Sequence, residues 1–180
     1  MRYLETERLI LRAVTTEDTQ ALFDIYGDPA TNLYNPNGSY PSLEYARRRM
    51  ASWLEGWAAD GIGQWAVEKR EAPGHVIGFG GLSYKDYGGE MRLNLGYRFA
   101  TSAWGCGYAS ETARAAIAFA FDEGKREAIY GMVRPNNLQS IRVLAKQGFR
   151  QVGQLSDVPG NPPSLVFMLS RDDYARESGK

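Results

Sequence analysis

Apolar residues recur along this chain with two different periods, and the changes of period divide it into strands and helices. Segments that alternate apolar and polar residues predict strands, because successive side chains of a strand point to opposite faces. Segments with apolar residues three and four positions apart predict amphipathic helices. The strands are expected at 7–14, 63–70, 75–84, 91–99, 127–133, 149–155 and 164–170, and the helices at 15–26, 42–60, 109–123 and 136–148.

The order of these segments predicts an α+β protein with a mixed three-layer α/β/α arrangement. About seven strands would form a central twisted sheet, and about four helices would flank it. The turns EAPG at 71–74 and KDYGGE at 85–90 are short, so most of the sheet should be antiparallel. In the strand at 91–99, alternation puts Tyr97 on one face and Arg98 on the other.

Length and charge limit the classes of function that the chain can have. A length of 180 residues predicts a single domain over 1–180. Lys and Arg number 21 and Asp and Glu number 21, so neither nucleic acid nor an anionic membrane is expected as a partner. The first thirty residues scatter charges, and no stretch reaches 18 apolar residues, which favours a cytoplasmic location. A monomer and a homodimer both stay open.

The single cysteine, Cys106, and the single histidine, His75, exclude further kinds of site. One cysteine can form neither an intrachain disulfide nor a thiolate-cluster zinc site, and no metal ion is expected. A Ser-His-Asp triad would have to use His75, which follows a Pro-Gly turn and is typical of a surface histidine opening a strand.

The stretch SAWGCGYASE at 102–111 places Gly105 and Gly107 directly before a helix. A helix start presents unpaired N–H groups and the positive end of the helix dipole, and glycine lets an anion approach the backbone. No lysine follows as a P-loop requires, and antiparallel strands precede the turn, which disfavours a dinucleotide fold. The pattern leaves two alternatives, a phosphate site and a plain tight turn.

The segment PATNLYNPNGSYP at 29–41 has the composition of an ordered recognition loop. It contains three Asn, three Pro, one Gly and two Tyr, which supply stacking and hydrogen-bonding groups. Tyr34 and Asn35 are the candidates in this loop for contacting a ligand.

Three motifs in this order resemble the GCN5-related N-acetyltransferase (GNAT) superfamily, and within it the branch of ribosomal-protein alanine N-acetyltransferases. They are LETERLILR at 4–12, LGYRF followed by WGCGYASE at 95–111, and Asn137-x-x-Ser140 leading to VLAKQGF at 143–149. The resemblance implies the GNAT fold and transfer of an acetyl group from acetyl-coenzyme A to a primary amine. The acceptor would be a protein N-terminal α-amine or a small-molecule amine, attacking directly within a ternary complex.

The resemblance also assigns roles to residues. The strand at 91–99 would part from its neighbour after Phe99 and pair edge-on with pantetheine, while the turn would hold the pyrophosphate. Ser140 would face the thioester sulfur, and a main-chain N–H between Leu95 and Tyr97 would stabilise the oxyanion. The cofactor would contact Tyr97, Arg98, Phe99, Trp104, Gly105, Cys106, Gly107, Tyr108, Ala109 and Asn137, and the acceptor would contact Tyr34, Asn35 and Asn94.

Two positions depart from the superfamily pattern. Leu144 stands where many members carry a tyrosine that protonates the sulfur, and Asn94 stands where relatives often carry a glutamate base. The base is therefore unassigned, and a noncatalytic acyl-coenzyme A sensor is the alternative function. An α-amine has a pKa of about 8 against about 10.4 for lysine, so an α-amine or small-molecule amine is favoured as acceptor. Asn137 is also suited to cap its helix.

Overall fold

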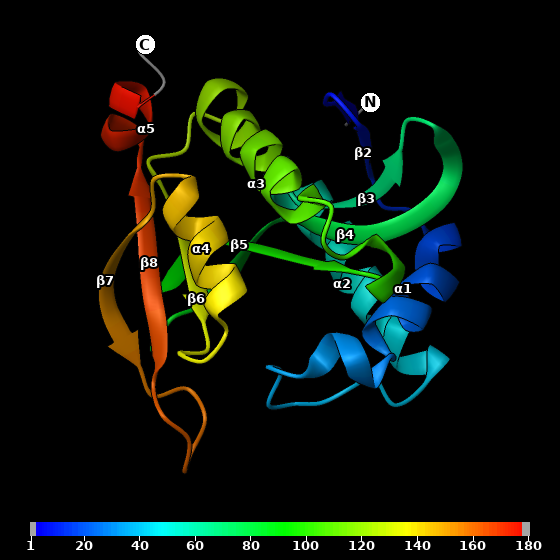
Figure 1. Cartoon of the computed structure of the whole chain (residues 1–180), viewed down its shortest axis with the longest axis horizontal. Helices are drawn as coiled ribbons and strands as arrows, with labels where there is room; N and C mark the ends of the chain where they lie inside the picture. Colours follow the sequence, from blue (N-terminus) through cyan, green and yellow to red (C-terminus); the bar gives the residue numbers. More distant parts are fainter. Residues whose placement is uncertain (1–2, 178–180) are drawn as a thin grey trace.

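The computed structural model describes residues 3–177, and its eight strands form one sheet (Figure 1). The strand order is β1-β2-β3-β4-β5-β6-β8-β7. The strands are β1 (Tyr3–Glu5), β2 (Leu9–Ala13), β3 (Gln64–Lys69), β4 (Ala72–Asp86), β5 (Met91–Phe99), β6 (Ala128–Val133), β7 (Arg150–Leu155) and β8 (Ser164–Ser170). The mixed α+β fold is confirmed, with one strand more than the seven expected.

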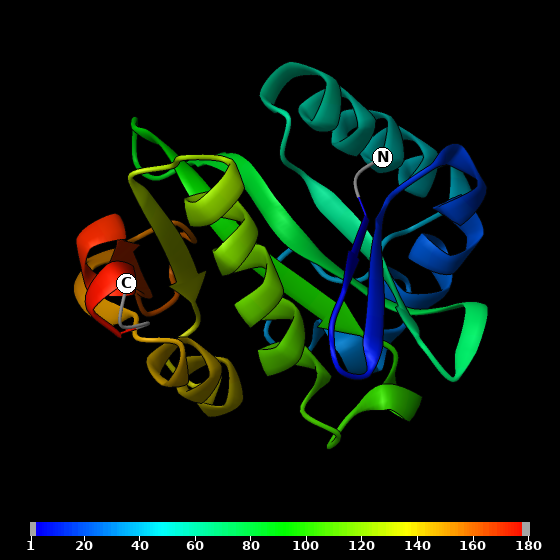
Figure 2. The same cartoon turned by 90° about the horizontal axis from the view of Figure 1, so that it is seen from above.

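Five α-helices accompany the sheet, one more than expected. They are α1 (Thr19–Tyr26), α2 (Leu43–Asp60), α3 (Tyr108–Ala118), α4 (Leu138–Lys146) and α5 (Arg171–Glu177). Helices α3 and α4 cover one face of the sheet and α1 and α2 cover the other (Figures 1 and 2). In the part of the chain from 3 to 177, no helix is long and apolar enough to cross a bilayer.

The predicted ends of the helices follow from local chemistry. Ser42 caps α2 by accepting a hydrogen bond from the Tyr45 N–H, and Gly61 ends it with φ of 68°, a conformation that favours glycine. The Asp18 carboxylate accepts from the Thr15 N–H at 2.8 Å, but a short 3-10 turn precedes α1, which delays its start to Thr19.

The sheet opens between β5 and β6, the one parallel neighbour pair in its order. Strand β5 pairs with β4 as far as Phe99, whereas its register with β6 is limited to Asn94 opposite Tyr130. The expected separation after Phe99 is therefore wrong by five residues, because β5 and β6 diverge directly after the pair of Asn94 and Tyr130. In Figure 1, β6, β8 and β7 stand to the left, β2 to β4 stand to the right, and β5 runs between them.

Candidate functional site

The backbone of β5 beyond Asn94 has one free edge. The Ala100 N–H donates to the Ile77 carbonyl at 2.9 Å, which fixes the phase of the ladder with β4. Polar groups of an antiparallel strand point to alternate sides, so Arg98 bonds toward β4, whereas Tyr97 and Phe99 direct theirs to the open edge. The side chain of Arg98 also lies on the opposite face from that of Tyr97.

The edge-facing backbone groups of Phe99 and Tyr97 differ in whether they are already hydrogen-bonded. The Phe99 carbonyl accepts a hydrogen bond from the Trp104 indole Nε1 at 3.0 Å. Within residues 3–177, the N–H and carbonyl of Tyr97 face no paired strand on that side, because the register of β5 with β6 ends at Asn94. An extended amide ligand could thus add to β5 at Tyr97 as a further strand.

The turn after β5 presents a row of backbone donors. Gly105 and Gly107 have φ of 77° and 79°, which bends the chain so that α3 begins at Tyr108. Within residues 3–177, the backbone N–H groups from 105 to 110 donate to no acceptor, as expected for a helix start. A Cβ at position 105 would meet no atom within 4 Å, so the approach to this turn is open. The geometry suits an anion.

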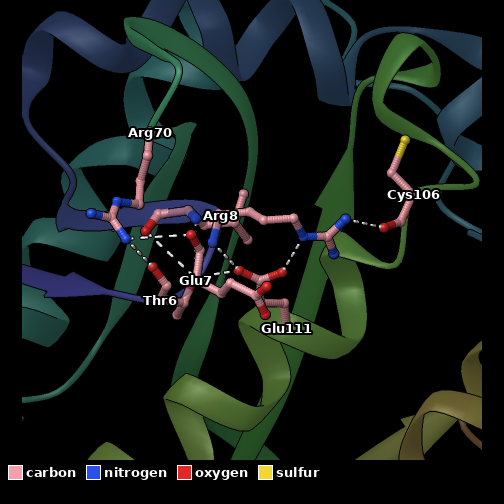
Figure 3. Close-up of polar contacts among 7 residues, drawn as sticks. Thr6, Glu7, Arg8, Arg70, Cys106 and Glu111 are labelled. Carbon is pink, nitrogen blue, oxygen red and sulfur yellow. Dashed lines mark hydrogen bonds and ion pairs between the residues drawn. The ribbon is translucent and has the colours of Figure 1, made fainter.

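A buried carboxylate fixes the turn from behind (Figure 3). Glu111, which is 7% exposed, accepts from the Arg8 Nε at 2.7 Å, from the Arg8 N–H at 2.9 Å and from the Thr6 hydroxyl. The Arg8 Nη1 in turn donates to the Cys106 carbonyl at 2.8 Å, and its guanidinium stacks on the Tyr108 ring. Burial raises the pKa of Glu111, but these hydrogen bonds outweigh it and lower the pKa below its ordinary value.

We call the contacts of Glu111 with Thr6 and Arg8 the Glu111 clamp. Thr6 and Arg8 belong to the motif LETERLILR, but no role could be assigned to them from the sequence. Their contacts to Cys106 and Glu111 join residues about a hundred positions apart, which no local pattern reveals. Cys106 itself is exposed and Trp104 is 49% exposed.

Ser140 and Tyr97 meet across the opening of the sheet. The Tyr97 hydroxyl donates to the Ser140 Oγ at 3.3 Å, and burial raises the pKa of Tyr97, so this hydroxyl stays protonated. The Asn137 side chain accepts from the Ser140 N–H at 3.3 Å and caps α4 as expected. Leu144 is buried and lies near Gly131 of β6, where it supplies no proton donor.

These residues line a cleft of about 300 Å³ that we call the α4 cleft. It lies between the free edge of β5 and the start of α4, and the loop at 31–36 closes one side. Its lining residues are Thr31, Tyr34, Asn35, Pro36, Lys85, Leu95, Gly96, Tyr97, Arg98, Gly131, Met132, Val133, Arg134, Asn137, Ser140, Leu144, Asp157 and Ser164.

A second cleft, the α2 cleft, has a volume of about 790 Å³. It shares the 95–98 segment with the α4 cleft, so the two meet at the free edge of β5. Its other walls come from α2, from the loop at 37–41 and from β4. Asn94 lines this cleft, and its Oδ1 accepts a hydrogen bond from the Tyr87 hydroxyl. The amide is therefore oriented, but it cannot take up a proton as a base would.

The loop expected to recognise the acceptor is internally braced. The Arg98 guanidinium lies over the Tyr26 ring and donates to the buried Asn32 at 2.7 Å. Asn35 donates to the Asn32 Oδ1 and accepts from the Asn37 N–H, so its amide is engaged within the loop. Tyr34 is 43% exposed and lines the α4 cleft rather than the α2 cleft.

Replacing Gly107 by alanine should weaken acetyl-coenzyme A binding by up to about fivefold to thirtyfold, because a residue with Cβ at φ of 79° costs about 1–2 kcal/mol. The added Cβ would lie 3.5 Å from the Arg8 Nη2, so backbone strain rather than a clash sets the effect. Calorimetry measures the dissociation constant. Gly153→Ala, where a Cβ meets no atom within 4 Å, is the control; equal affinities for both variants would contradict a role for the turn.

The fold and clefts define a class of protein: a mixed α/β/α domain whose sheet opens at one strand, beside a glycine turn suited to an anion. The acetyltransferase (GNAT) domain model matches residues 8–150, and the chain belongs to this family. The uncharacterised N-acetyltransferase YoaA of Bacillus subtilis is 29% identical over 154 residues, covering 84% of this chain and 85% of its own. The B. subtilis protein YkkB is 30% identical over 151 residues, covering 81% and 83%.

Solved structures share the fold over nearly the whole chain. An acetyltransferase from Agrobacterium tumefaciens has a TM-score of 0.77 at 26% identity over 94% of each chain. The ribosomal-protein-S5-alanine acetyltransferase from Vibrio fischeri has a TM-score of 0.79 at 18% identity, over 97% of this chain and 99% of that one. The spermidine N-acetyltransferase from Vibrio cholerae, solved with CoA and spermine, has a TM-score of 0.78 at 17% identity, over 94% and 99%.

Proposed function

We propose that residues 1–180 act as one acetyltransferase domain that transfers an acetyl group from acetyl-coenzyme A to a primary amine. The observation that carries this proposal is the meeting of two clefts at the free edge of β5, next to Ser140. Membership of the GNAT family supports the reaction class, since the family uses acetyl-coenzyme A and an amine. The acceptor reaches the thioester through the α2 cleft, and the thioester lies in the α4 cleft.

Acetyl-coenzyme A is held along the path from the turn to Ser140. The unpaired N–H groups at 105–110 bind the pyrophosphate, with Gly105 and Gly107 leaving space for it. The pantetheine amides pair with the Tyr97 backbone at the open edge of β5. Asn137, which lines the α4 cleft, contacts the pantetheine end next to the thioester.

The amine nitrogen attacks the acetyl carbon directly, and the tetrahedral intermediate then loses the thiolate as the C–S bond breaks. The Tyr97 N–H donates to the oxyanion. The sulfur leaves as thiolate while the Ser140 hydroxyl donates a hydrogen bond to it, and the Tyr97 hydroxyl, which donates to the Ser140 Oγ at 3.3 Å, orients that donor. A tyrosine from another element thus supports the departing sulfur through Ser140, where Leu144 supplies no hydroxyl.

The amine enters the reaction as its neutral form, and its proton passes to water. No carboxylate lines the α2 cleft within residues 3–177, and Asn94 cannot accept the proton. An α-amine, with a pKa of about 8, is partly neutral near pH 7 and therefore suits such a site better than a lysine amine.

Membership of the branch of ribosomal-protein alanine acetyltransferases remains part of this proposal, and it would make a protein N-terminus the acceptor. The V. fischeri neighbour bears that name, whereas the V. cholerae neighbour is named for spermidine, so the shared fold accommodates both N-terminal and small-molecule amines. A protein N-terminus and a small amine are both candidates for this chain.

The test is calorimetry with acetyl-coenzyme A, followed by release of free thiol in the presence of amines and N-terminal peptides. Binding with thiol release supports a transferase. Binding without release from any amine would identify a noncatalytic acyl-coenzyme A sensor instead. Absence of binding would contradict both, along with the assignment of the turn at 105–110.

Replacing Tyr34 by alanine should raise the acceptor KM about threefold to tenfold. Tyr34 precedes Asn35, which lines both clefts, so its 43% exposed ring stands near the junction where the acceptor meets the thioester, and such a ring contributes on the order of 1 kcal/mol to a ligand. Initial rates over a range of acceptor concentrations measure the change. Leu33→Ala, which removes a 73% exposed neighbour outside both clefts, is the control. An unchanged KM for Tyr34→Ala would remove the loop from acceptor recognition.

A further inference from the structure

The charges that line the α2 cleft are all of one sign. Arg49, Lys85 and Arg98 contribute three cations, and among the lining residues of the described chain none is Asp or Glu. The remaining walls are amides, hydroxyls and aromatic rings, including Tyr26, Tyr40, Tyr45, Trp53 and Tyr84. A cleft of this composition attracts a ligand that carries negative charge and apolar surface.

None of the three cations is held in an ion pair. Within residues 3–177, neither Arg49 nor Lys85 nor Arg98 pairs with a carboxylate, and Arg98 bonds to the Asn32 amide and lies over the Tyr26 ring. Burial lowers the pKa of Lys85 and the charge of Asp157, which shares the α4 cleft with it, partly opposes this, but Asp157 is itself ion-paired with Arg134 at 3.4 Å.

The positions of the cations also distinguish this charge from a general surface feature. They come from three different elements, Arg49 from α2, Lys85 from β4 and Arg98 from β5, and all three line the α2 cleft, Lys85 and Arg98 at its junction with the α4 cleft. The acidic side chains of the adjoining clefts, Asp157 in the α4 cleft and Glu55 and Asp60 in a cleft at the end of α2, do not line it. The positive lining therefore belongs to the space through which the acceptor would enter.

We infer that the acceptor is an amine that also carries a carboxylate, of the kind found in an α-amino acid, and not a polyamine. The inference rests on the proposed function, since it names the acceptor of that transfer. A carboxylate would be recognised by the arginine and lysine side chains, and an apolar side group would lie against the aromatic walls. A polycation would be repelled by the same charges.

The same charges assist the reaction. A neighbouring cation disfavours the ammonium form of an amine, so the lining lowers the pKa of the bound acceptor. This effect supplies neutral amine in a cleft that has no carboxylate to act as base. Recognition and activation of the acceptor thus have one origin.

The experiment compares matched acceptors under saturating acetyl-coenzyme A, with thiol release as readout. The pairs are leucine against leucinamide and phenylalanine against phenylalaninamide, with putrescine as the cationic amine. An amide has the lower amine pKa of its pair, so intrinsic reactivity favours the amide. We expect kcat/KM to be at least about tenfold higher for the acids, the effect of one charge contact in a partly desolvated cleft.

Charge reversal tests the residues themselves. Arg49→Glu and Lys85→Glu should each reduce the preference for the acid about five- to tenfold, and the double variant should favour putrescine. Arg47→Glu is the matched control, because Arg47 is exposed on the same helix and lies outside this cleft. Circular dichroism verifies that each variant retains its fold.

The outcomes separate this inference from the function on which it rests. A preference for the acids that is lost on charge reversal at Arg49 and Lys85 but kept with Arg47→Glu supports it. Release that favours amides or putrescine in the unmodified protein overturns the carboxylate acceptor and leaves the transferase intact. Binding of acetyl-coenzyme A without release from any acceptor overturns the transferase, and the acceptor assignment with it.

Discussion

Replacing Ser140 by alanine is expected to lower kcat by about 100-fold or more, a typical contribution of a positioned hydrogen-bond donor to developing negative charge. The Ser140 hydroxyl lies in the α4 cleft and accepts a hydrogen bond from Tyr97 at 3.3 Å. Without it, the thiolate leaves unassisted. The dissociation constant for acetyl-coenzyme A should change less than about threefold, because the pyrophosphate and pantetheine contacts do not involve this hydroxyl.

Thiol release measures kcat, and calorimetry measures the affinity for acetyl-coenzyme A. Tyr97→Phe should lower kcat by about tenfold, less than Ser140→Ala, because the Ser140 hydroxyl can still donate a hydrogen bond to the sulfur but is no longer oriented. Gln139→Ala, one residue earlier on an exposed face of α4, is the control. An acetyl thioester with a more acidic thiol should restore much of the lost rate in Ser140→Ala. A full rate in Ser140→Ala would rule out its part in thiolate departure.

Replacing Glu111 by alanine is expected to lower the free energy of unfolding by about 2–3 kcal/mol and to weaken acetyl-coenzyme A binding about tenfold. The change leaves the Thr6 hydroxyl and the Arg8 N–H without their acceptor. Because the Arg8 side chain is 45% exposed, its ion pair contributes less than these two groups. The turn also loses the support that Arg8 gives to the Cys106 carbonyl.

Urea denaturation of the protein and of Glu111→Ala measures this difference. Glu127→Gln is the control, because Glu127 is 89% exposed in its ion pair with Arg171 and should change stability by less than about 0.5 kcal/mol. Equal losses of stability in the two variants would contradict the buried clamp. A loss of stability with unchanged acetyl-coenzyme A affinity would confine Glu111 to folding.

The Glu111 carboxylate also predicts how the free energy of unfolding depends on pH. Hydrogen bonds lower the pKa of Glu111 in the folded protein, so its contribution to stability is present above the unfolded value of about 4.3. That contribution is lost as the pH falls through the lowered folded value. The difference in unfolding free energy between the protein and Glu111→Gln should therefore shrink below about pH 4.

Segments with a full period of apolar residues were predictable, and the short ones were not. The strand expected at 91–99 is β5, Met91–Phe99, and the helix expected at 42–60 is α2, Leu43–Asp60. Strand β1 has three residues, too few to show an alternation, and it exists because it pairs with β2. Helix α5 has seven residues and buries none, so no apolar stripe marks it.

The candidate site divides in the same way. Sequence alone determined the glycine turn before α3 and the cap at Asn137, because glycine conformation and helix capping depend on a few adjacent residues. Tertiary structure alone decided the opening after Asn94 and the contact of Tyr97 with Ser140, 43 positions apart. Strand register and helix packing set these distances, and both arise from the whole sheet. For the same reason the convergence of cations on the α2 cleft became visible only once α2, β4 and β5 were side by side.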